Sequence, residues 1–177
     1  LTNALYDAGI VMNDVNPDYV VIGEGRNYSL ETLTKAVNLV INGAKLIGAN
    51  ADVSGPIENG IAPACRALVA PIEMATGKEA YFCGKPNPLM MRTGLKLLGC
   101  HSEEAVIIGD RMDTDIIAGT ESGVETVLVL SGISNEKTPS KYAYQPTMIL
   151  SGVGEIVKIA ESRTKNRDAA KDQPTES

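Results

Sequence analysis

The sequence contains Ala105-Val106-Ile107-Ile108-Gly109-Asp110, a run of apolar and mostly β-branched residues that ends in Gly and Asp. Its apolar positions are consecutive rather than alternating, which is typical of a strand buried on both faces of a parallel sheet. A helix is predicted directly after it, over residues 114–122. The run thus indicates one strand of a β-α-β unit, in which ligands bind beyond the carboxyl end of the strand.

The same alternation of strands and helices extends in both directions from this run. Further strands are predicted at 19–23, 44–50, 80–84, 124–130 and 147–150, and helices at 1–8, 30–42, 63–75, 88–98 and 153–162. Pro71 predicts a kink or a break in its helix, and the Gly and Pro residues of 52–62 indicate a loop. The polar residues after Arg163 predict a frayed tail. The pattern predicts an α/β fold with a parallel sheet.

Composition excludes several classes of protein. Hydrophobic residues make up 44% of the 177 residues, enough for a packed core. The net charge of -6 argues against a nucleic-acid-binding surface, and no apolar run approaches the roughly 20 residues of a membrane span. Cys65, Cys83 and Cys100 form no CxxC pair, and the single His101 cannot complete a zinc site. These features predict reduced thiols in a cytoplasmic protein.

Several acids gather within one turn of the end of the central strand. Asp110 follows Gly109 directly, and Asp113 and Asp115 come soon after it. Carboxylates at such a position, with Gly allowing close approach, are reasonable ligands for a hard cation such as Mg²⁺. The alternative is that Asp113, Thr114 or Asp115 only caps the following helix. Spacing alone leaves both interpretations open.

A second strand end carries a lysine in Cys83-Gly84-Lys85-Pro86-Asn87-Pro88. Lys85 comes directly after a predicted strand, where its ammonium could reach an anion at the edge of the sheet. Pro86 and Pro88 stiffen the exit and begin the next helix. A lysine in this position is more often only a solvated surface charge. Taken alone, the signal for anion binding is weak.

Together, the two strand ends match one family in order and spacing. The run Gly84-Lys85-Pro86-Asn87-Pro88, the run from Val106 to Ile116, Gly119 with Gly123, and the run from Thr126 to Gly132 resemble the haloacid dehalogenase (HAD) phosphatases. The similarity is to the NagD and p-nitrophenyl-phosphatase branch, which carries a large type-2 cap. It continues upstream through residues 14–23, 48–52, 60–63 and 73–77, and covers roughly residues 1–160.

The resemblance implies a role for five residues. Lys85 matches the lysine that neutralises the charge of the substrate phosphate and of the nucleophile. Asp110 matches the catalytic acid that binds Mg²⁺, and Asp115 matches the second acid of the metal motif. Asn50 and Asp52 match a cap loop that contributes to substrate choice, although family members often have Pro where this chain has Ala51. The implied cofactor is Mg²⁺.

The resemblance also implies a domain organisation. Residues 1–80 would form the α/β cap and residues 81–162 the second half of a HAD-like Rossmannoid parallel sheet, which would therefore be incomplete; residues 163–177 would be a disordered tail. Caps of this type often mediate dimers, so a homodimer through the cap is an expected partner, with neither nucleic acid nor membrane. The expected substrate is a small nucleotide, sugar or aryl phosphate, and no residue selects among these.

One part of the family pattern is missing from the sequence. The family begins its chemistry at an Asp-x-Asp near the amino terminus and binds the phosphoryl oxygens with a Ser or Thr after the next strand. Asp113-Thr114-Asp115 has the same letters but lies inside the metal motif. The chain also opens within a predicted helix and without Met. We therefore expect a fragment of a Mg²⁺-dependent phosphatase that works through an aspartyl-phosphate, with the chain alone inactive.

Two alternatives remain from the sequence. One is a catalytically inactive module that binds Mg²⁺ or a phosphoester without turning it over. The other is a dinucleotide-binding Rossmann domain, which the sequence disfavours because no GxGxxG follows any predicted strand.

Overall fold

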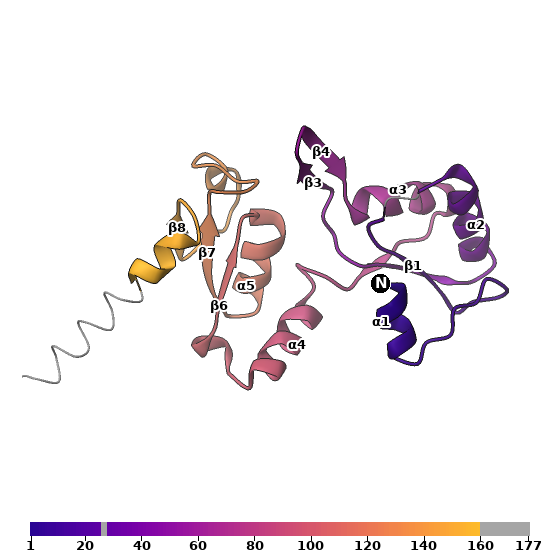
Figure 1. The fold of residues 1–177 in the computed structure, drawn as a ribbon, viewed down its shortest axis with the longest axis horizontal. Coiled ribbons are helices and arrows are strands. Elements are labelled where there is room, and N and C mark those ends of the chain that lie inside the picture. Colours follow the sequence, from indigo (N-terminus) through magenta and orange to yellow (C-terminus); the bar gives the residue numbers. More distant parts are fainter. Residues whose placement is uncertain (26–27, 160–177) are drawn as a thin grey trace, which may run out of the picture. The chain divides into compact units, whose positions relative to one another are not determined.

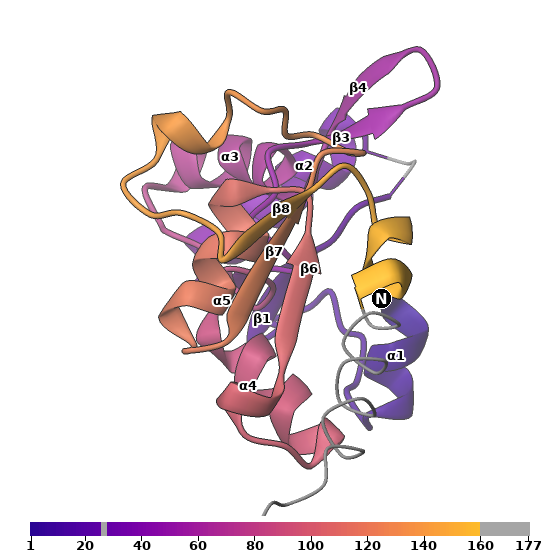
Figure 2. The same cartoon turned by 90° about the vertical axis from the view of Figure 1, so that its left-hand side faces the viewer.

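The computed structural model describes residues 1–25 and 28–159. The chain divides into two compact units, with the division between Leu98 and Gly99. Each unit contains a three-stranded parallel sheet covered by helices (Figures 1 and 2). The predicted α/β class with parallel sheets is therefore confirmed. The assignment of 1–80 to a cap and 81–162 to a core stays a prediction, and the predicted tail lies outside the described residues.

The first unit is built on the sheet β1-β2-β5, in that spatial order. Its strands are parallel, with Val20 paired to Leu46 and Gly48 paired to Phe82. The elements of this unit are α1 (Thr2–Asp7), β1 (Tyr19–Ile22), α2 (Leu30–Ile41), β2 (Lys45–Gly48), β3 (Ser54–Ile57), β4 (Gly60–Pro63), α3 (Cys65–Thr76), β5 (Tyr81–Phe82) and α4 (Pro88–Leu98).

Helices α2 and α3 share one apolar core with the sheet. The buried members of this core are Val20, Ala36, Val40, Ala44, Leu46, Cys65, Val69 and Ile72. Helix α2 begins where the sequence predicts, because Ser29 caps it in a reciprocal capping box with Thr32. Its buried residues, Ala36 and Val40, lie in its central and last turns, whereas the apolar Leu30 and Ile41 are exposed. These two residues are the first and the last of the helix.

The segment predicted as a loop contains an antiparallel hairpin. Strands β3 and β4 pair from Ser54 with Pro63 to Ile57 with Gly60, and the hairpin projects from the first unit in Figure 1. The prediction of a loop is wrong for these strands, because Gly and Pro also occur within the strands of a short two-stranded hairpin. The two residues of the turn are Glu58 and Asn59, between the paired residues Ile57 and Gly60. Gly60, the first residue of β4, has a φ of +141°, a conformation that Gly adopts readily.

Helix α3 runs without a break through Pro71. A proline inside a helix removes one hydrogen bond and costs about 3 kcal/mol, which is the reason for the prediction of a kink or a break; no break occurs. Val69 and Ile72, on either side of the proline, are fully buried in the core of the first unit. Their packing holds both halves of the helix on the same sheet and offsets that cost.

The second unit is built on the parallel sheet β6-β7-β8. Its elements are η1 (Ser102–Glu104), β6 (Val106–Gly109), η2 (Met112–Ile116), α5 (Ile117–Glu121), β7 (Glu125–Val129), η3 (Pro139–Lys141) and β8 (Met148–Leu150), and residues 154–159 are helical. Leu128 packs with η2 in one core cluster, whereas Val127 and Val129 pack with Leu150 and the last helix in another. Both faces of β7 are therefore covered, as its continuous apolar run predicts.

The helix after β6 starts earlier than predicted, and its first turn is π-helical. The sequence predicts it over residues 114–122, whereas a π-helical turn, η2, begins at Met112 and leads into α5. In this turn the Ile116 amide donates to the Arg111 carbonyl five residues back, at 3.1 Å. Such single π-turns occur frequently at functional sites.

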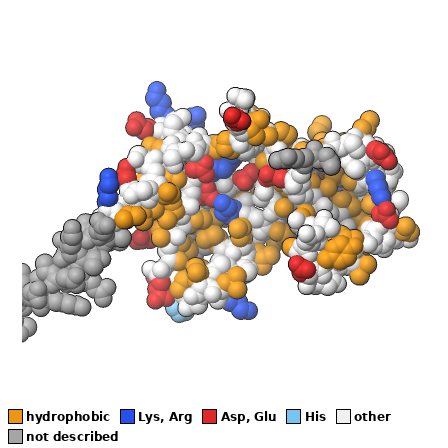
Figure 3. Space-filling view, viewed as in Figure 1, with side chains coloured by type: hydrophobic (Ala, Val, Ile, Leu, Met, Phe, Trp, Pro, Cys, Tyr) orange, Lys and Arg blue, Asp and Glu red, His pale blue; other side chains and the backbone are white. Residues whose placement is uncertain are grey.

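The surface carries scattered apolar side chains on the face shown in Figure 3. Single exposed apolar residues are normal for a folded domain. No helix in the described part of the chain is long and apolar enough to cross a membrane. Cys65 is buried, Cys83 and Cys100 are half-buried, and all three are free thiols.

Candidate functional site

Asp110 lies just beyond the carboxyl end of β6 and is held by the backbone of the loop after β7. Its Oδ2 accepts a hydrogen bond from the Ile133 amide at 2.8 Å, and its carbonyl accepts one from the Ser134 amide at 3.1 Å. Gly132 passes so close that a Cβ there would lie closer than 3.0 Å to the Asp110 carboxylate. The neighbouring strand end therefore fixes where this carboxylate points.

Asp115 is brought back onto the same strand end by the π-turn. Its side chain is buried, the whole residue being 4% exposed, and its Oδ2 accepts a hydrogen bond from the Arg111 amide at 3.1 Å. A Cβ on Gly109 would lie closer than 3.0 Å to the Asp115 carboxylate, so Gly109 leaves the space that this carboxylate occupies. Asp115 thus contacts the backbone on both sides of Asp110. The structure brings the two predicted metal-binding acids together.

The third acid of the motif is placed differently. Asp113 has a side chain 44% exposed and forms a two-pronged ion pair with Arg111, with Nε–Oδ1 at 3.1 Å and Nη2–Oδ2 at 2.9 Å. Neither η2 nor α5 has a side-chain cap at its amino end. The interpretation of Asp113 or Thr114 as a helix cap is therefore wrong, because the chain enters this helix through a π-turn whose first amide is bonded by Asp115.

Asn50 occupies the middle of the corresponding edge in the first unit. It follows β2, the central strand, and its Nδ2 donates to Glu24 Oε1 at 3.0 Å, beyond the end of β1. Its Oδ1 accepts from the Asp52 amide at 3.1 Å, and the Asp52 carbonyl accepts from the Arg66 amide at 2.9 Å. The two predicted cap-loop residues are thus joined to each other and anchored to α3.

Lys85 follows β5 at the same edge and is half-buried. The preceding Gly84 packs against the β2 loop, where an added Cβ would lie 2.7 Å from the Ala49 carbonyl oxygen and 2.9 Å from Asn50 Cβ. After the cis Lys85–Pro86 bond, Asn87 donates to the Phe82 carbonyl at 2.7 Å and accepts from the Leu89 amide at 2.9 Å. The backbone that carries Lys85 is therefore fixed against the Asn50 loop.

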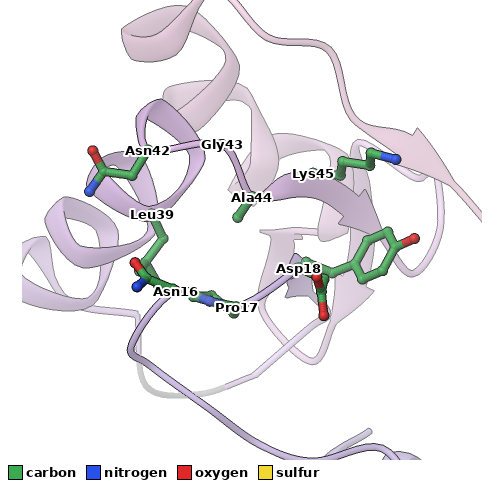
Figure 4. A pocket seen from close by; sticks show the side chains of 9 residues that line it. Asn16, Pro17, Asp18, Leu39, Asn42, Gly43, Ala44 and Lys45 are labelled. Carbon is green, nitrogen blue, oxygen red and sulfur yellow. The ribbon is translucent and has the colours of Figure 1, made fainter.

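A pocket lies at the other edge of this sheet, at the amino ends of β1 and β2 (Figure 4). Its lining residues are Asn16, Pro17, Asp18, Tyr19, Leu39, Asn42, Gly43, Ala44 and Lys45. None of the five predicted site residues lines it. Parallel sheets bind ligands at the carboxyl ends of their strands, so the position of this pocket argues against it as the functional site.

Comparison with known proteins agrees with this arrangement. A family model described as HAD-hydrolase-like matches residues 82–156. A dihydroxyacetone phosphatase of Corynebacterium glutamicum is 49% identical over 156 residues, which cover 88% of this chain and 57% of that protein. The ribonucleotide monophosphatase NagD of Escherichia coli is 44% identical over 156 residues, covering 88% and 61%. Residues 82–156 thus match the HAD-like hydrolases, and the chain is homologous to proteins of the NagD and p-nitrophenyl-phosphatase branch over 88% of its length.

Solved structures of this branch have the same fold. NagD of Escherichia coli gives a TM-score of 0.79 at 43% identity, and the match covers 88% of this chain and 61% of that one. A 4-nitrophenylphosphatase of Thermotoga maritima gives a TM-score of 0.83 at 30% identity, and the match covers 89% of this chain and 60% of that one. The resemblance predicted from the sequence is therefore confirmed. The chain spans 57% to 61% of the length of the two curated relatives described above.

The predicted site residues of this HAD-like chain fall into two groups. Asn50, Asp52 and Lys85 share one sheet edge in the first unit, and Asp110 and Asp115 share one strand end in the second. Sequence reasoning missed Glu24 and Asn87 as partners of these residues. Glu24 could have been found from its position directly after a strand, and Asn87 from its place beside Lys85.

A tyrosine is hydrogen-bonded to the backbone of the π-turn. The Tyr144 hydroxyl donates to the Met112 carbonyl at 2.8 Å. Burial, then the neighbouring Tyr142, Asp113 and Glu121, raise the pKa of Tyr144 above its ordinary value. The neutral phenol is therefore the form that this environment favours.

This raised pKa predicts a pH dependence of stability. The contribution of Tyr144 is fully present below the unfolded pKa of about 10 and is lost as pH rises through the higher folded pKa. Urea unfolding between pH 8 and 11 should therefore show a steeper loss of unfolding free energy for the unaltered chain than for Tyr144→Phe. Parallel curves for the two proteins would show that this phenol is not coupled to folding.

Proposed function

We propose that this chain supplies phosphate- and metal-binding residues to a Mg²⁺-dependent phosphatase of small phosphate monoesters. The observation that carries the proposal is the pair Asp110 and Asp115, two carboxylates placed at one strand end by backbone hydrogen bonds. The curated relatives described above are named as phosphatases, which supports the same class of reaction.

The donor set fits Mg²⁺ better than a metal that needs a full protein cage. The described residues contain no group of three or more His, Cys, Asp or Glu side chains that could hold a metal ion. Mg²⁺ is usually held by one or two carboxylates, with waters and substrate phosphate completing its octahedron. Asp110 and Asp115 would hold it, and it would supply charge stabilisation to the phosphoryl oxygens.

The other residues would act on the substrate directly. The Lys85 ammonium would offset the negative charge of the phosphate, and the Asn50–Asp52 loop would contact the organic part. In the proposed reaction a carboxylate attacks phosphorus, the alcohol leaves with a proton, and water hydrolyses the resulting acyl phosphate. We propose that the attacking carboxylate is none of the acids of this chain, and that the chain alone is inactive.

The test is turnover of p-nitrophenyl phosphate with Mg²⁺. The chain alone is compared with its reading frame continued upstream of Leu1, here called the extended protein. We expect turnover only in the extended protein, and a loss of about 100-fold or more in Lys85→Ala. Lys96→Ala, at an exposed position on α4, is the matched control and should retain turnover.

Each other outcome has a defined meaning. Turnover by the chain alone would contradict the proposed absence of a nucleophile, and Asp113 would then be the first residue to test as the nucleophile. Failure of both proteins to turn over substrate, with Mg²⁺ or phosphate still bound, would favour a catalytically inactive binding module.

A further inference from the structure

Three polar residues form a row along the carboxyl edge of the first sheet. Glu24 follows β1, Asn50 follows β2 and Lys85 follows β5, and the spatial order of the strands is β1-β2-β5. Adjacent strands lie about 4.8 Å apart, so the backbone positions of Glu24 and Lys85 are separated by roughly 10 Å. That distance suits a ligand with phosphate at one end and a small organic group at the other.

The middle residue of the row is held by contacts with Glu24, Asp52 and Gly84. The Asn50 amide donates to Glu24 at 3.0 Å and accepts from Asp52 at 3.1 Å, and its Cβ packs against Gly84. Glu24 is different. Glu24 is exposed, and its Oε1 accepts the hydrogen bond from Asn50. Its Oε2 forms no hydrogen bond with any of the described residues. The outer end of the row therefore presents a carboxylate oxygen that is held in place and able to accept.

We propose that Glu24 is a specificity-determining residue that accepts a hydrogen bond from a hydroxyl group of the substrate. The inference rests on the proposed function, with the phosphate of the substrate at Lys85. An ionised carboxylate only accepts hydrogen bonds, so it attracts hydroxyl groups and repels a second anionic group. The preferred class is then phosphate monoesters of hydroxylated molecules, such as sugars, polyols or nucleosides, over monoesters that carry a carboxylate.

The substitution Glu24→Gln separates this role from structural support. A glutamine keeps an amide oxygen that can accept the bond from Asn50, so the loop remains positioned, while the negative charge is removed. Glu31→Gln is the matched control, because Glu31 is an exposed acid of the same unit on α2, away from the strand ends.

The experiment measures kcat/KM of the extended protein for ribose 5-phosphate, 2-phosphoglycolate and p-nitrophenyl phosphate. In Glu24→Gln we expect kcat/KM for ribose 5-phosphate, divided by kcat/KM for p-nitrophenyl phosphate, to fall about fivefold to tenfold. The reason is that charged hydrogen bonds are about twice as strong as neutral ones. The corresponding ratio of kcat/KM for 2-phosphoglycolate to that for p-nitrophenyl phosphate should rise, because the variant no longer places a carboxylate charge near the carboxylate of 2-phosphoglycolate. Glu31→Gln should change neither ratio.

Three results would overturn the inference, and they are distinguishable. Unchanged ratios in Glu24→Gln would show that Glu24 does not contact the substrate. An equal fall for all three substrates would show that it only supports Asn50. Absence of turnover of any of the three by the unaltered extended protein would overturn the proposed function, and this inference with it.

Discussion

Replacing Asp110 with Asn is expected to lower kcat of the extended protein by about 100- to 1,000-fold, a loss typical of removing one main electrostatic group from an active site. The amide keeps the size of the side chain and can still accept from the Ile133 amide. What it removes is the negative charge that a divalent cation requires. Asp115→Asn should show a loss of the same kind, because its carboxylate lies on the same strand end.

Asp113→Asn is the matched control for this prediction. It belongs to the same motif, but its carboxylate is paired with Arg111 and its side chain is 44% exposed. We expect less than about a fivefold change in kcat, as for an exposed ion pair worth about 1 kcal/mol or less. The measurement is steady-state turnover of p-nitrophenyl phosphate over a Mg²⁺ titration. If Asp113→Asn proved as inactive as Asp110→Asn, the assignment of metal ligands from the structure would be wrong.

Gly132→Ala is expected to lower kcat by about 10- to 100-fold without unfolding the second unit. The added Cβ would lie closer than 3.0 Å to three atoms of Asp110, so the carboxylate must move. A misplacement of about 1 Å in an active site can cost a factor of about 100. The cost in stability should stay within the roughly 1–3 kcal/mol that is typical of overpacking.

Gly152→Ala provides the comparison for that substitution. Its Cβ would meet only Ser131, at an ordinary distance of 3.7 Å. Neither Gly132 nor Gly152 has a positive φ, so Ala imposes no backbone strain at either position. Turnover and thermal unfolding by circular dichroism would be measured for both variants. Equal activity in the two would show that the position of the Asp110 carboxylate is not critical.

Helices and strands with a strong local pattern were predictable. The helix over residues 88–98 has the predicted bounds, because Pro88 favours a first helical position and Gly99, with a φ of +67°, ends the helix. The strand at 105–110 was predictable because its apolar residues are consecutive and it ends in Gly and Asp. In each case the signal lies within a few residues of the element that it specifies.

The errors arose where specific contacts outweigh the average propensity of a segment. Helix α3 continues through Pro71 because buried neighbours on both sides pack against the sheet. The turn at Met112 is π-helical rather than regular, and Asp115 bonds the backbone at its start. The contacts that carry α3 through Pro71 come from other segments of the chain, whereas the π-turn depends on a bond between a side chain and a nearby backbone amide that helix propensity does not describe.

The sequence by itself determined the α/β class, the family and the identity of the residues expected to carry chemistry. These depend on periodicity and on motifs, which are properties of neighbouring residues. Only the tertiary structure decided that Gly132 limits the position of Asp110, that Asp113 is diverted to Arg111, and that Glu24 is hydrogen-bonded to Asn50. Gly132 and Glu24 act on partners more than twenty residues away, which parallel strand pairing brings to one edge of a sheet; the choice between Asp113 and Asp115 depends on the geometry of the π-turn.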